Sequence, residues 1–122
     1  MNIEKFKKWL EELGKAWSSL DYQAAANLFA ENVEYYESVF NKPLKNWNEV
    51  FNLWKVIPSN QTDVSFKFEV ISTSKNLCVA NWQVERILLP QNIKQSIDGI
   101  FVFRLNENGL CNYFKQWRTN SL

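Results

Sequence analysis

The start of the chain places apolar residues at the spacing of a helix. Six apolar side chains recur three or four positions apart and would share one face: Ile3, Phe6, Leu10, Leu13, Trp17 and Leu20. The positions between them are mostly charged, and oppositely charged pairs four residues apart, such as Glu4 with Lys8, support an exposed face. The pattern predicts an amphipathic helix over residues 3–20.

Two shorter helices are predicted from their capping residues. Asp21 can accept a hydrogen bond from the first free backbone amides of a helix, which predicts a second helix through Phe29. Asn46 and Glu49 have the three-residue spacing of a capping box, with Asn in place of the usual Ser or Thr. An apolar pattern of helical period follows them, and Pro58 is expected to end this third helix.

The remaining segments have the pattern of β-strands. A short β-prone stretch over residues 33–37 predicts a first strand, and a turn-forming segment follows it. From Thr62 onward apolar and polar residues alternate, which is typical of a strand with one buried face. Turn-forming segments then separate three further predicted strands, over Leu77–Leu88, Ser96–Leu105 and Leu110–Trp117.

This order of elements predicts an α+β domain. Antiparallel strands joined by short turns and segregated from the helices are typical of a sheet with helices packed on one face. Here a curved antiparallel sheet would pack on three N-terminal helices and leave a cone between them. Gly99, inside a predicted strand, is where such a sheet could bend or bulge. Without repeats or linkers, residues 1–122 are expected to form one domain.

The aromatic content points to a pocket, and the charge argues against some partners. Six Trp, four Tyr and nine Phe exceed what closing a core requires, so an aromatic-lined cavity is expected. Fourteen Lys plus Arg balance thirteen Asp plus Glu, which argues against a nucleic acid or an anionic membrane as partner. No apolar run approaches the roughly 20 residues of a membrane span, and the charged amino end predicts a cytoplasmic protein.

The residue inventory also limits the chemistry. The chain has no His and only two Cys, which argues against a His-based metal site, a Ser-His or Cys-His pair and a disulfide framework. We therefore expect no metal and no cofactor. Cys78 and Cys111 lie in predicted strands and are interpreted as small buried hydrophobic residues.

Several short motifs, in their order and spacing, carry a resemblance that covers almost the whole chain. They are Asp21, Val33-Glu34-Tyr35-Tyr36-Glu37, Pro43-Leu44 before a helix with Trp54, Asp98-Gly99-Ile100-Phe101, and Asn108-Gly109-Leu110-Cys111 with Gln116-Trp117. With them the chain resembles the nuclear transport factor 2-like superfamily, in particular its SnoaL-like and ketosteroid isomerase-like bacterial members.

The resemblance implies a cone-shaped fold with a pocket open at one end, commonly dimeric through the outer face of the sheet. It does not fix a function, because the superfamily includes isomerases, cyclases, dehydratases, epoxide hydrolases and binding modules. The cyclase-like members use a His and Asp pair in the pocket, and this chain has no His. The isomerase-like donor usually comes from the first helix, where this chain offers Trp17 instead.

Two carboxylates are candidates for proton transfer. Glu37 ends the first predicted strand, and the resemblance implies a base near this position, whose pKa apolar neighbours would raise. The alternative is a solvated glutamate at a strand end. For Asp98 the resemblance implies a protonated aspartate that donates to a developing oxyanion. Its alternatives are an edge position beside Gly99, where it accepts backbone hydrogens, or a pair with Arg86 or Arg104.

Tyr35 and Tyr36 are adjacent on the first strand and point in opposite directions, so one of them should face the cone. A phenol there could donate a hydrogen bond to a ligand carbonyl, as the resemblance implies for isomerase-like sites. Tyr36 is the catalytic candidate and Tyr35 a candidate ligand contact. The alternative is an aromatic residue of the core or rim.

Six aromatic residues are predicted to line the pocket: Trp17, Tyr35, Trp54, Trp82, Phe101 and Trp117. Arg86 and Arg104 are candidate partners for a ligand carboxylate. An even-numbered turn before the last strand would place four of its residues on the face of Asp98: Cys111, Tyr113, Lys115 and Trp117. The pattern leaves open which face is concave, since both carry large apolar side chains.

These features favour a domain that binds a small, partly apolar molecule, uncharged or weakly anionic, in a cone-shaped pocket. The first alternative is a cofactor-free isomerase, dehydratase or cyclase, or a related lyase or hydrolase, acting by carboxylate-mediated proton transfer. The second is an interaction module that dimerises through the outer sheet and binds no ligand. A homodimer through that face is the expected assembly.

Overall fold

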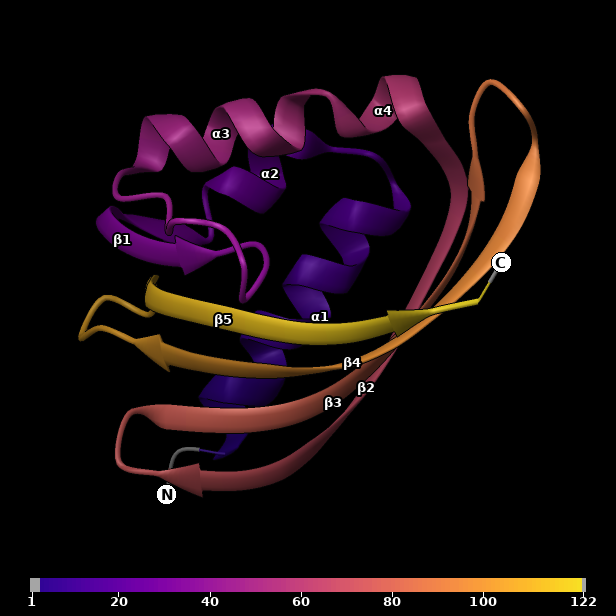
Figure 1. Cartoon of the computed structure of the whole chain (residues 1–122). Coiled ribbons are helices and arrows are strands. Elements are labelled where there is room, and N and C mark those ends of the chain that lie inside the picture. The colour runs from indigo at the N-terminus through magenta and orange to yellow at the C-terminus, as the bar shows by residue number, and fades with distance from the viewer. Residues whose placement is uncertain (1–2, 122) are drawn as a thin grey trace.

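The computed structural model describes residues 3–121 as helices packed on the concave face of a curved five-stranded sheet (Figure 1). The elements in chain order are α1 (Ile3–Ser18), α2 (Tyr22–Ala26), β1 (Phe29–Tyr36), α3 (Trp47–Lys55), α4 (Ile57–Asn60), β2 (Gln61–Ser74), β3 (Leu77–Leu88), β4 (Ile93–Leu105) and β5 (Cys111–Asn120). The strand order is β1-β5-β4-β3-β2. The predicted α+β class is confirmed, although the sheet is mixed, because β1 runs parallel to β5.

Side-chain caps begin the two predicted short helices. Asp21 Oδ1 accepts a hydrogen bond from the Ala24 backbone amide at 3.0 Å, and Asn46 Oδ1 accepts from the Glu49 amide at 2.9 Å. The returning bond of the second cap differs from the prediction, because Glu49 Oε1 accepts from the amide of Lys45, one residue earlier than in a capping box.

Two predicted helix ends are wrong. The second helix ends at Ala26, and Phe29 instead begins β1, where its buried ring packs edge-on against Trp9. The third helix ends at Lys55, before Pro58. Pro58 lies in the first turn of α4, where a missing backbone N–H leaves no hydrogen bond unmade.

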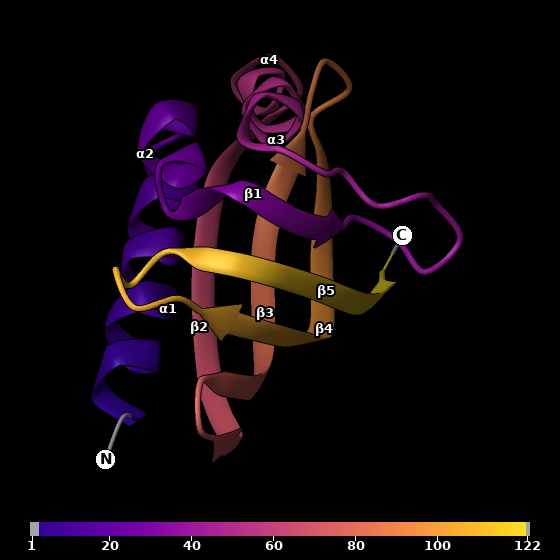
Figure 2. The ribbon, with the colours of Figure 1, turned by 90° about the vertical axis from the view of Figure 1, so that its left-hand side faces the viewer.

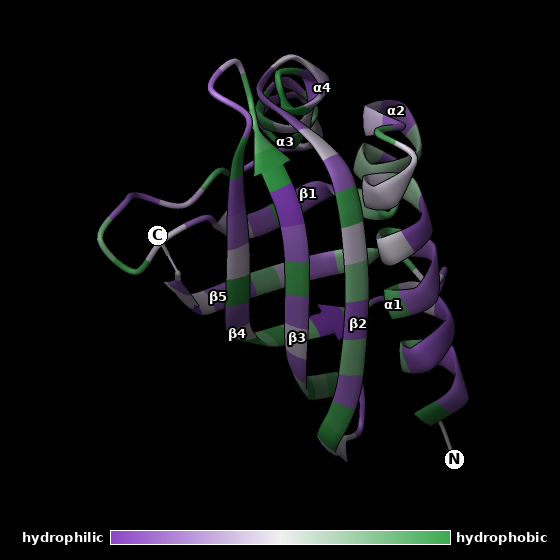
Figure 3. Cartoon of the chain, turned by 90° about the vertical axis from the view of Figure 1, so that its right-hand side faces the viewer, coloured by the Kyte–Doolittle hydropathy of each residue, from purple (hydrophilic) through white to green (hydrophobic). Residues whose placement is uncertain are grey.

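The core lies between α1 and the concave face. Trp9 stacks on Phe103 with ring centroids 4.7 Å apart, and Phe6 meets the same ring edge-on at 5.8 Å. Figure 2 shows α1 alongside the sheet, with α3 and α4 across one end of it. The alternation of hydrophilic and hydrophobic residues along β2, β3 and β4 is visible in Figure 3 and has the period of two that was predicted.

The register of β4 with β5 decides which residues are concave. Ile100, Val102 and Arg104 pair with Trp117, Lys115 and Tyr113, so these residues share one face, as predicted. The structure shows that this face is the convex one. The assignment of Cys111 to that face is wrong. A register shift between Arg104 and Leu105 pairs Leu105 with Cys111, and both are buried on the concave side.

Gly99 is not the site of the bulge. It pairs continuously with Trp82 on one side and Arg118 on the other, whereas the irregularity of β4 lies at Arg104–Leu105. A Cβ at Gly99 would lie 2.4 Å from the Trp117 carbonyl oxygen and 2.7 Å from Trp82 Nε1. Glycine is therefore required here for close packing.

Within residues 3–121, no helix is both long enough and apolar enough to cross a membrane. The cytoplasmic location inferred from the sequence stays a prediction.

Candidate functional site

A cavity of about 390 Å³ lies between the helices and the concave face, at the end of the sheet that α3 and α4 cover. Its walls are mostly apolar and come from α1, α3, β1 and the inward residues of β3, β4 and β5. Seven polar residues complete the lining: Glu37, Asn60, Gln61, Arg86, Gln91, Gln116 and Arg118. The predicted cone is therefore open and not filled by its own side chains.

Four of the six predicted aromatic residues line this cavity: Trp17, Tyr35, Trp54 and Phe101. Trp82 does not line it, because it is fully buried behind Phe101, with the two rings stacked 4.7 Å apart. Trp117 does not line it either, because it lies on the convex face and is 44% exposed.

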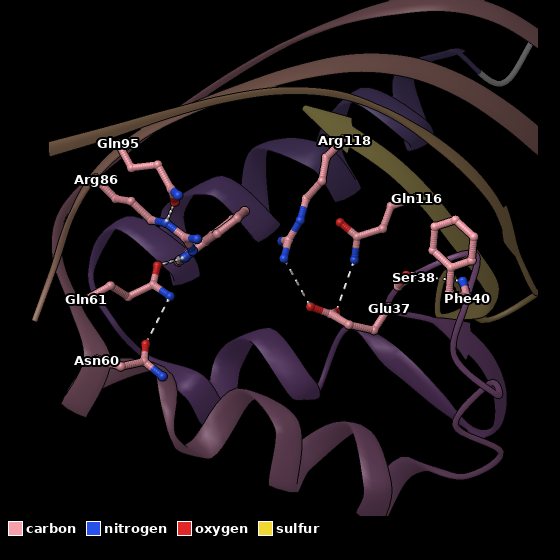
Figure 4. Close-up of polar contacts among 10 residues, drawn as sticks. Glu37, Ser38, Phe40, Asn60, Gln61, Arg86, Gln95, Gln116 and Arg118 are labelled. Carbon is pink, nitrogen blue, oxygen red and sulfur yellow. Dashed lines mark hydrogen bonds and ion pairs between the residues drawn. The ribbon is translucent and has the colours of Figure 1, made fainter. Parts of the chain in front are cut away.

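Glu37 follows directly after β1 and faces the cavity (Figure 4). Its Oε1 accepts a hydrogen bond from Gln116 Nε2 at 3.2 Å, and its Oε2 lies 3.8 Å from Arg118 Nη2. Burial raises the pKa of Glu37 above its ordinary value, while the charges of Arg118 and Arg86 and the Tyr35 hydroxyl group lower it in part. The site thus holds a carboxylate whose affinity for a proton is increased.

The two neighbouring tyrosines have separate environments. Tyr35 is 2% exposed, stacks on Phe114 at 4.8 Å and lines the cavity. Burial raises its pKa well above the ordinary value, so its hydroxyl group stays protonated and can donate a hydrogen bond. Tyr36 lies on the opposite face, where its hydroxyl donates to Glu34 and its ring lies beside Tyr113. Tyr35 therefore lines the cavity, whereas Tyr36 does not.

Asp98 is not brought together with Glu37 in the cavity, because it lies on the convex side of the sheet. Its Oδ1 accepts from Asn81 Nδ2 at 2.7 Å, and its Oδ2 accepts from Gln83 Nε2 at 2.9 Å. These two bonds lower the pKa of Asp98, which keeps the carboxylate ionised. The expectation of a protonated donor, and the alternative of a pair with Arg86 or Arg104, do not agree with this placement.

The two candidate arginines are on different faces. Arg86 lines the cavity, and its Nε donates to the Oε1 of buried Gln95 at 2.9 Å. Burial lowers the pKa of Arg86, as does the charge of Arg118, whereas Glu37 raises it. The guanidinium of Arg104 instead lies over the Tyr113 ring on the convex face, 5.6 Å from its centroid. Of these two candidates, Arg86 alone lines the cavity and can meet a ligand there.

Two tryptophan N–H groups border the cavity. Trp17 Nε1 donates to Gln61 Oε1 at 2.8 Å, and Gln61 Nε2 in turn donates to Asn60 Oδ1 at 3.2 Å. Trp54 meets Trp17 edge-on at 5.5 Å, and its buried Nε1 has no hydrogen-bond partner within residues 3–121. This N–H group nevertheless lies near the Tyr35 hydroxyl group, whose pKa it lowers in part.

Metal binding and thiol chemistry find no support in the described part of the chain. Residues 3–121 contain no group of three or more His, Cys, Asp or Glu side chains that could hold a metal ion. Cys78 and Cys111 are free and buried. Burial raises the pKa of Cys78 to about 11 and also raises that of Cys111, so neither thiol is activated as a nucleophile.

A model of the SnoaL-like domain matches residues 8–113 of the chain. The chain belongs to the SnoaL-like domain family. This family lies within the nuclear transport factor 2-like superfamily, which the sequence motifs had indicated. A comparison with curated protein sequences finds no match.

Solved structures share the fold of this SnoaL-like domain. "Putative Isomerase from Bacillus subtilis" has a TM-score of 0.86 and 16% identity, covering 98% of this chain and 89% of that one. Delta 5-3-ketosteroid isomerase from Mycobacterium sp. has a TM-score of 0.79 and 12% identity, covering 96% and 98%. A computationally designed 17-OHP binder has a TM-score of 0.77 and 16% identity, covering 92% and 93%. These low identities establish the fold alone.

The polar residues of this SnoaL-like domain that the sequence analysis missed have different origins. Gln116 and Arg118 continue the inward alternation of Phe114 along β5. Gln116 already lies within the predicted strand, and extending that strand to Asn120 would have added Arg118. Gln61 could not be found in this way. A register shift between Thr62 and Ser65 separates it from the regular alternation of β2.

Proposed function

We propose that this SnoaL-like domain binds a small, partly apolar molecule in the cavity at the α3–α4 end of the sheet. The observation that carries the proposal is the open, aromatic-lined cavity of about 390 Å³ with several polar side chains at its walls. Pockets that hold small molecules have roughly 300–1,000 Å³, mostly apolar walls and a few polar groups. The designed 17-OHP binder of the same fold supports the idea that such a cone can hold an organic ligand.

The proposal is tested with neutral bicyclic ketones as probes: 2-acetonaphthone, 2-tetralone and 1-decalone, each titrated by calorimetry. Leu53 lines the cavity from α3, so Leu53→Trp should fill part of it and weaken binding about tenfold or more. Asn52 is the neighbouring exposed residue outside the lining, so Asn52→Trp is the matched control and should bind like the wild type. Absence of binding by all three probes, or equal binding by the Leu53→Trp variant, would contradict the proposal.

A second candidate function is proton transfer next to a carbonyl group, with Glu37 as the base. Glu37 is the only carboxylate in the cavity lining within residues 3–121, and burial raises its pKa, which favours accepting a proton. The proton would pass from the carbon beside the carbonyl to Glu37. The resulting enolate oxygen would accept a hydrogen bond from the Tyr35 hydroxyl group, which lines the same cavity.

The test follows the exchange of the acidic protons of 2-tetralone for deuterium in D₂O by NMR. The wild type should accelerate the exchange, and Glu37→Gln should abolish the acceleration. Glu34→Gln is the control, because Glu34 contacts Tyr36 and Lys45 outside the cavity. Binding of 2-tetralone without accelerated exchange would exclude this second function and leave the first intact.

A homodimer through the convex face is the third proposal. Trp117 is 44% exposed on that face, and Phe40, in the segment after β1, is 93% exposed. Both residues border one surface groove, and a second copy of the chain would cover them. Sedimentation velocity should give a dimer for the wild type and a monomer for Trp117→Glu. A monomeric wild type would contradict the proposal and exclude a module that acts by dimerising.

A further inference from the structure

The cavity carries an excess positive charge. Its lining within residues 3–121 contains two guanidinium groups, Arg86 and Arg118, and one carboxylate, Glu37. Tyr35 is protonated, because burial raises its pKa, and adds no charge. The other walls are aromatic, aliphatic or amide groups. The net charge of the lining is therefore +1, in surroundings that screen it less than water does.

The single carboxylate is already committed to Arg118. Glu37 Oε2 is 3.8 Å from Arg118 Nη2, and the Oε1 atom is held by Gln116 Nε2 at 3.2 Å. The structure contains no ion pair between Glu37 and Arg86 within residues 3–121. Arg86 thus has no ion-pair partner among these residues, and a half-buried guanidinium without such a partner costs free energy until an anion reaches it.

The orientation of Arg86 is fixed by its neighbour. Gln95 is directly opposite on β4, is 8% exposed and accepts the Arg86 Nε hydrogen at 2.9 Å. The two Nη atoms make no hydrogen bond or ion pair with any residue from 3 to 121. Arg86 lines the cavity, and Figure 4 shows its side chain linked to Gln95. One side of the guanidinium is therefore anchored, and its outer N–H pair is left for a ligand.

We propose that the ligand of this cavity is an organic monocarboxylate whose carboxylate pairs with the two Nη atoms of Arg86. The inference rests on the proposed binding function and names the class of its ligand. A planar carboxylate matches two parallel N–H groups of a guanidinium, and one carboxylate balances one excess charge. The apolar body of the ligand would lie against Trp17 and Trp54, which border the same cavity. A phosphate dianion would bring more charge than Arg86 alone can balance.

The experiment compares two probes of nearly the same shape, 2-naphthoate and 2-acetonaphthone, by calorimetry at pH 7. A charge-assisted pair with a guanidinium should make 2-naphthoate bind about tenfold or more tightly than the ketone. Arg86→Gln should bring the ratio of the 2-naphthoate affinity to the 2-acetonaphthone affinity down to about one. Arg104→Gln removes the same charge from the convex face and should keep the preference. Arg86→Lys keeps the positive charge but lacks the two parallel N–H groups of a guanidinium, so it should keep only part of the preference for 2-naphthoate.

The outcomes separate this inference from the proposed function. Equal binding of both probes to the wild type, or a carboxylate preference that survives Arg86→Gln, would overturn the inference while ketone binding still supports the cavity. Failure of 2-naphthoate and of all three neutral ketones to bind would overturn both proposals. If Arg86→Gln does not fold, as judged by circular dichroism, the comparison of Arg86→Lys with the wild type decides. If the preference for 2-naphthoate is unchanged in Arg86→Lys, that result would contradict the proposed pairing of the carboxylate with the two Nη atoms of Arg86.

Discussion

Gly99→Ala tests whether the packing behind the cavity is as close as the structure indicates. The new Cβ would lie 2.4 Å from the Trp117 carbonyl oxygen and 2.7 Å from Trp82 Nε1. The oxygen belongs to the neighbouring strand, and Trp82 is fully buried and stacked on Phe101, so neither can move freely. Overpacking of a core typically costs about 1–3 kcal/mol. The lower chain entropy of unfolded Ala offsets about 0.4–1 kcal/mol, which leaves a net loss of about 1–2 kcal/mol.

For a chain of this length, that loss corresponds to a fall in Tm of about 4–8 °C, because the unfolding entropy is roughly 2.1 cal/mol/K per residue. Thermal unfolding followed by near-ultraviolet circular dichroism measures it. Trp82→Phe removes the indole atoms nearest the new Cβ, so the double variant Gly99→Ala/Trp82→Phe should lose less stability than the two single losses added together. A Gly99→Ala protein as stable as the wild type, or strictly additive losses, would refute the reasoning.

Three further predictions concern the groups around the cavity. Gln95→Leu should release the Arg86 guanidinium and weaken 2-naphthoate binding several-fold, with 2-acetonaphthone binding unchanged; both are measured by calorimetry. Burial raises the pKa of Glu37 in the folded state, so the stability of the wild type should fall as pH rises from the ordinary glutamate pKa through the raised one. Glu37→Gln should remove this part of the decline, as measured by urea unfolding between pH 4 and 8. The hydrogen bonds from Gln83 and Asn81 instead lower the pKa of Asp98 in the folded state, so the contribution of Asp98 to stability should be present above the ordinary aspartate pKa and lost as pH falls through the lowered value. Asp98→Asn should abolish this loss of stability at acidic pH in unfolding experiments and leave ketone binding unchanged.

The features that are determined by residues close together in the sequence were predicted correctly. The caps at Asp21 and Asn46 and the period of two in β2 are encoded within a few positions, and the structure contains all three. The local pattern around Phe29 is helical and predicts a helix there. Phe29 is in a strand because tertiary packing among Trp9, Tyr35 and Phe114 outweighs that weak preference.

The face of each site residue depends on register, which is a long-range property. Sequence alone placed Tyr35 and Tyr36 on opposite faces but could not choose between them. The choice is made by the parallel pairing of β1 with β5, which sets Tyr35 beside inward-facing Phe114. Likewise one bulge after Arg104 moves Cys111 to the concave face, because a shift of one residue reverses the direction of a strand side chain.

The direction of the strands explains why a partly apolar anion suits this cavity. β3 and β5 are both antiparallel to β4, so they run in the same direction. Along β3 the inward residues change from buried Trp82 to half-buried Arg86, and along β5 they change from buried Phe114 to Arg118. The two series therefore end in positive charge at the same end of the sheet. A ligand with an apolar body and an anionic end can satisfy both parts in one orientation, whereas the reverse orientation would bury its charge among aromatic rings.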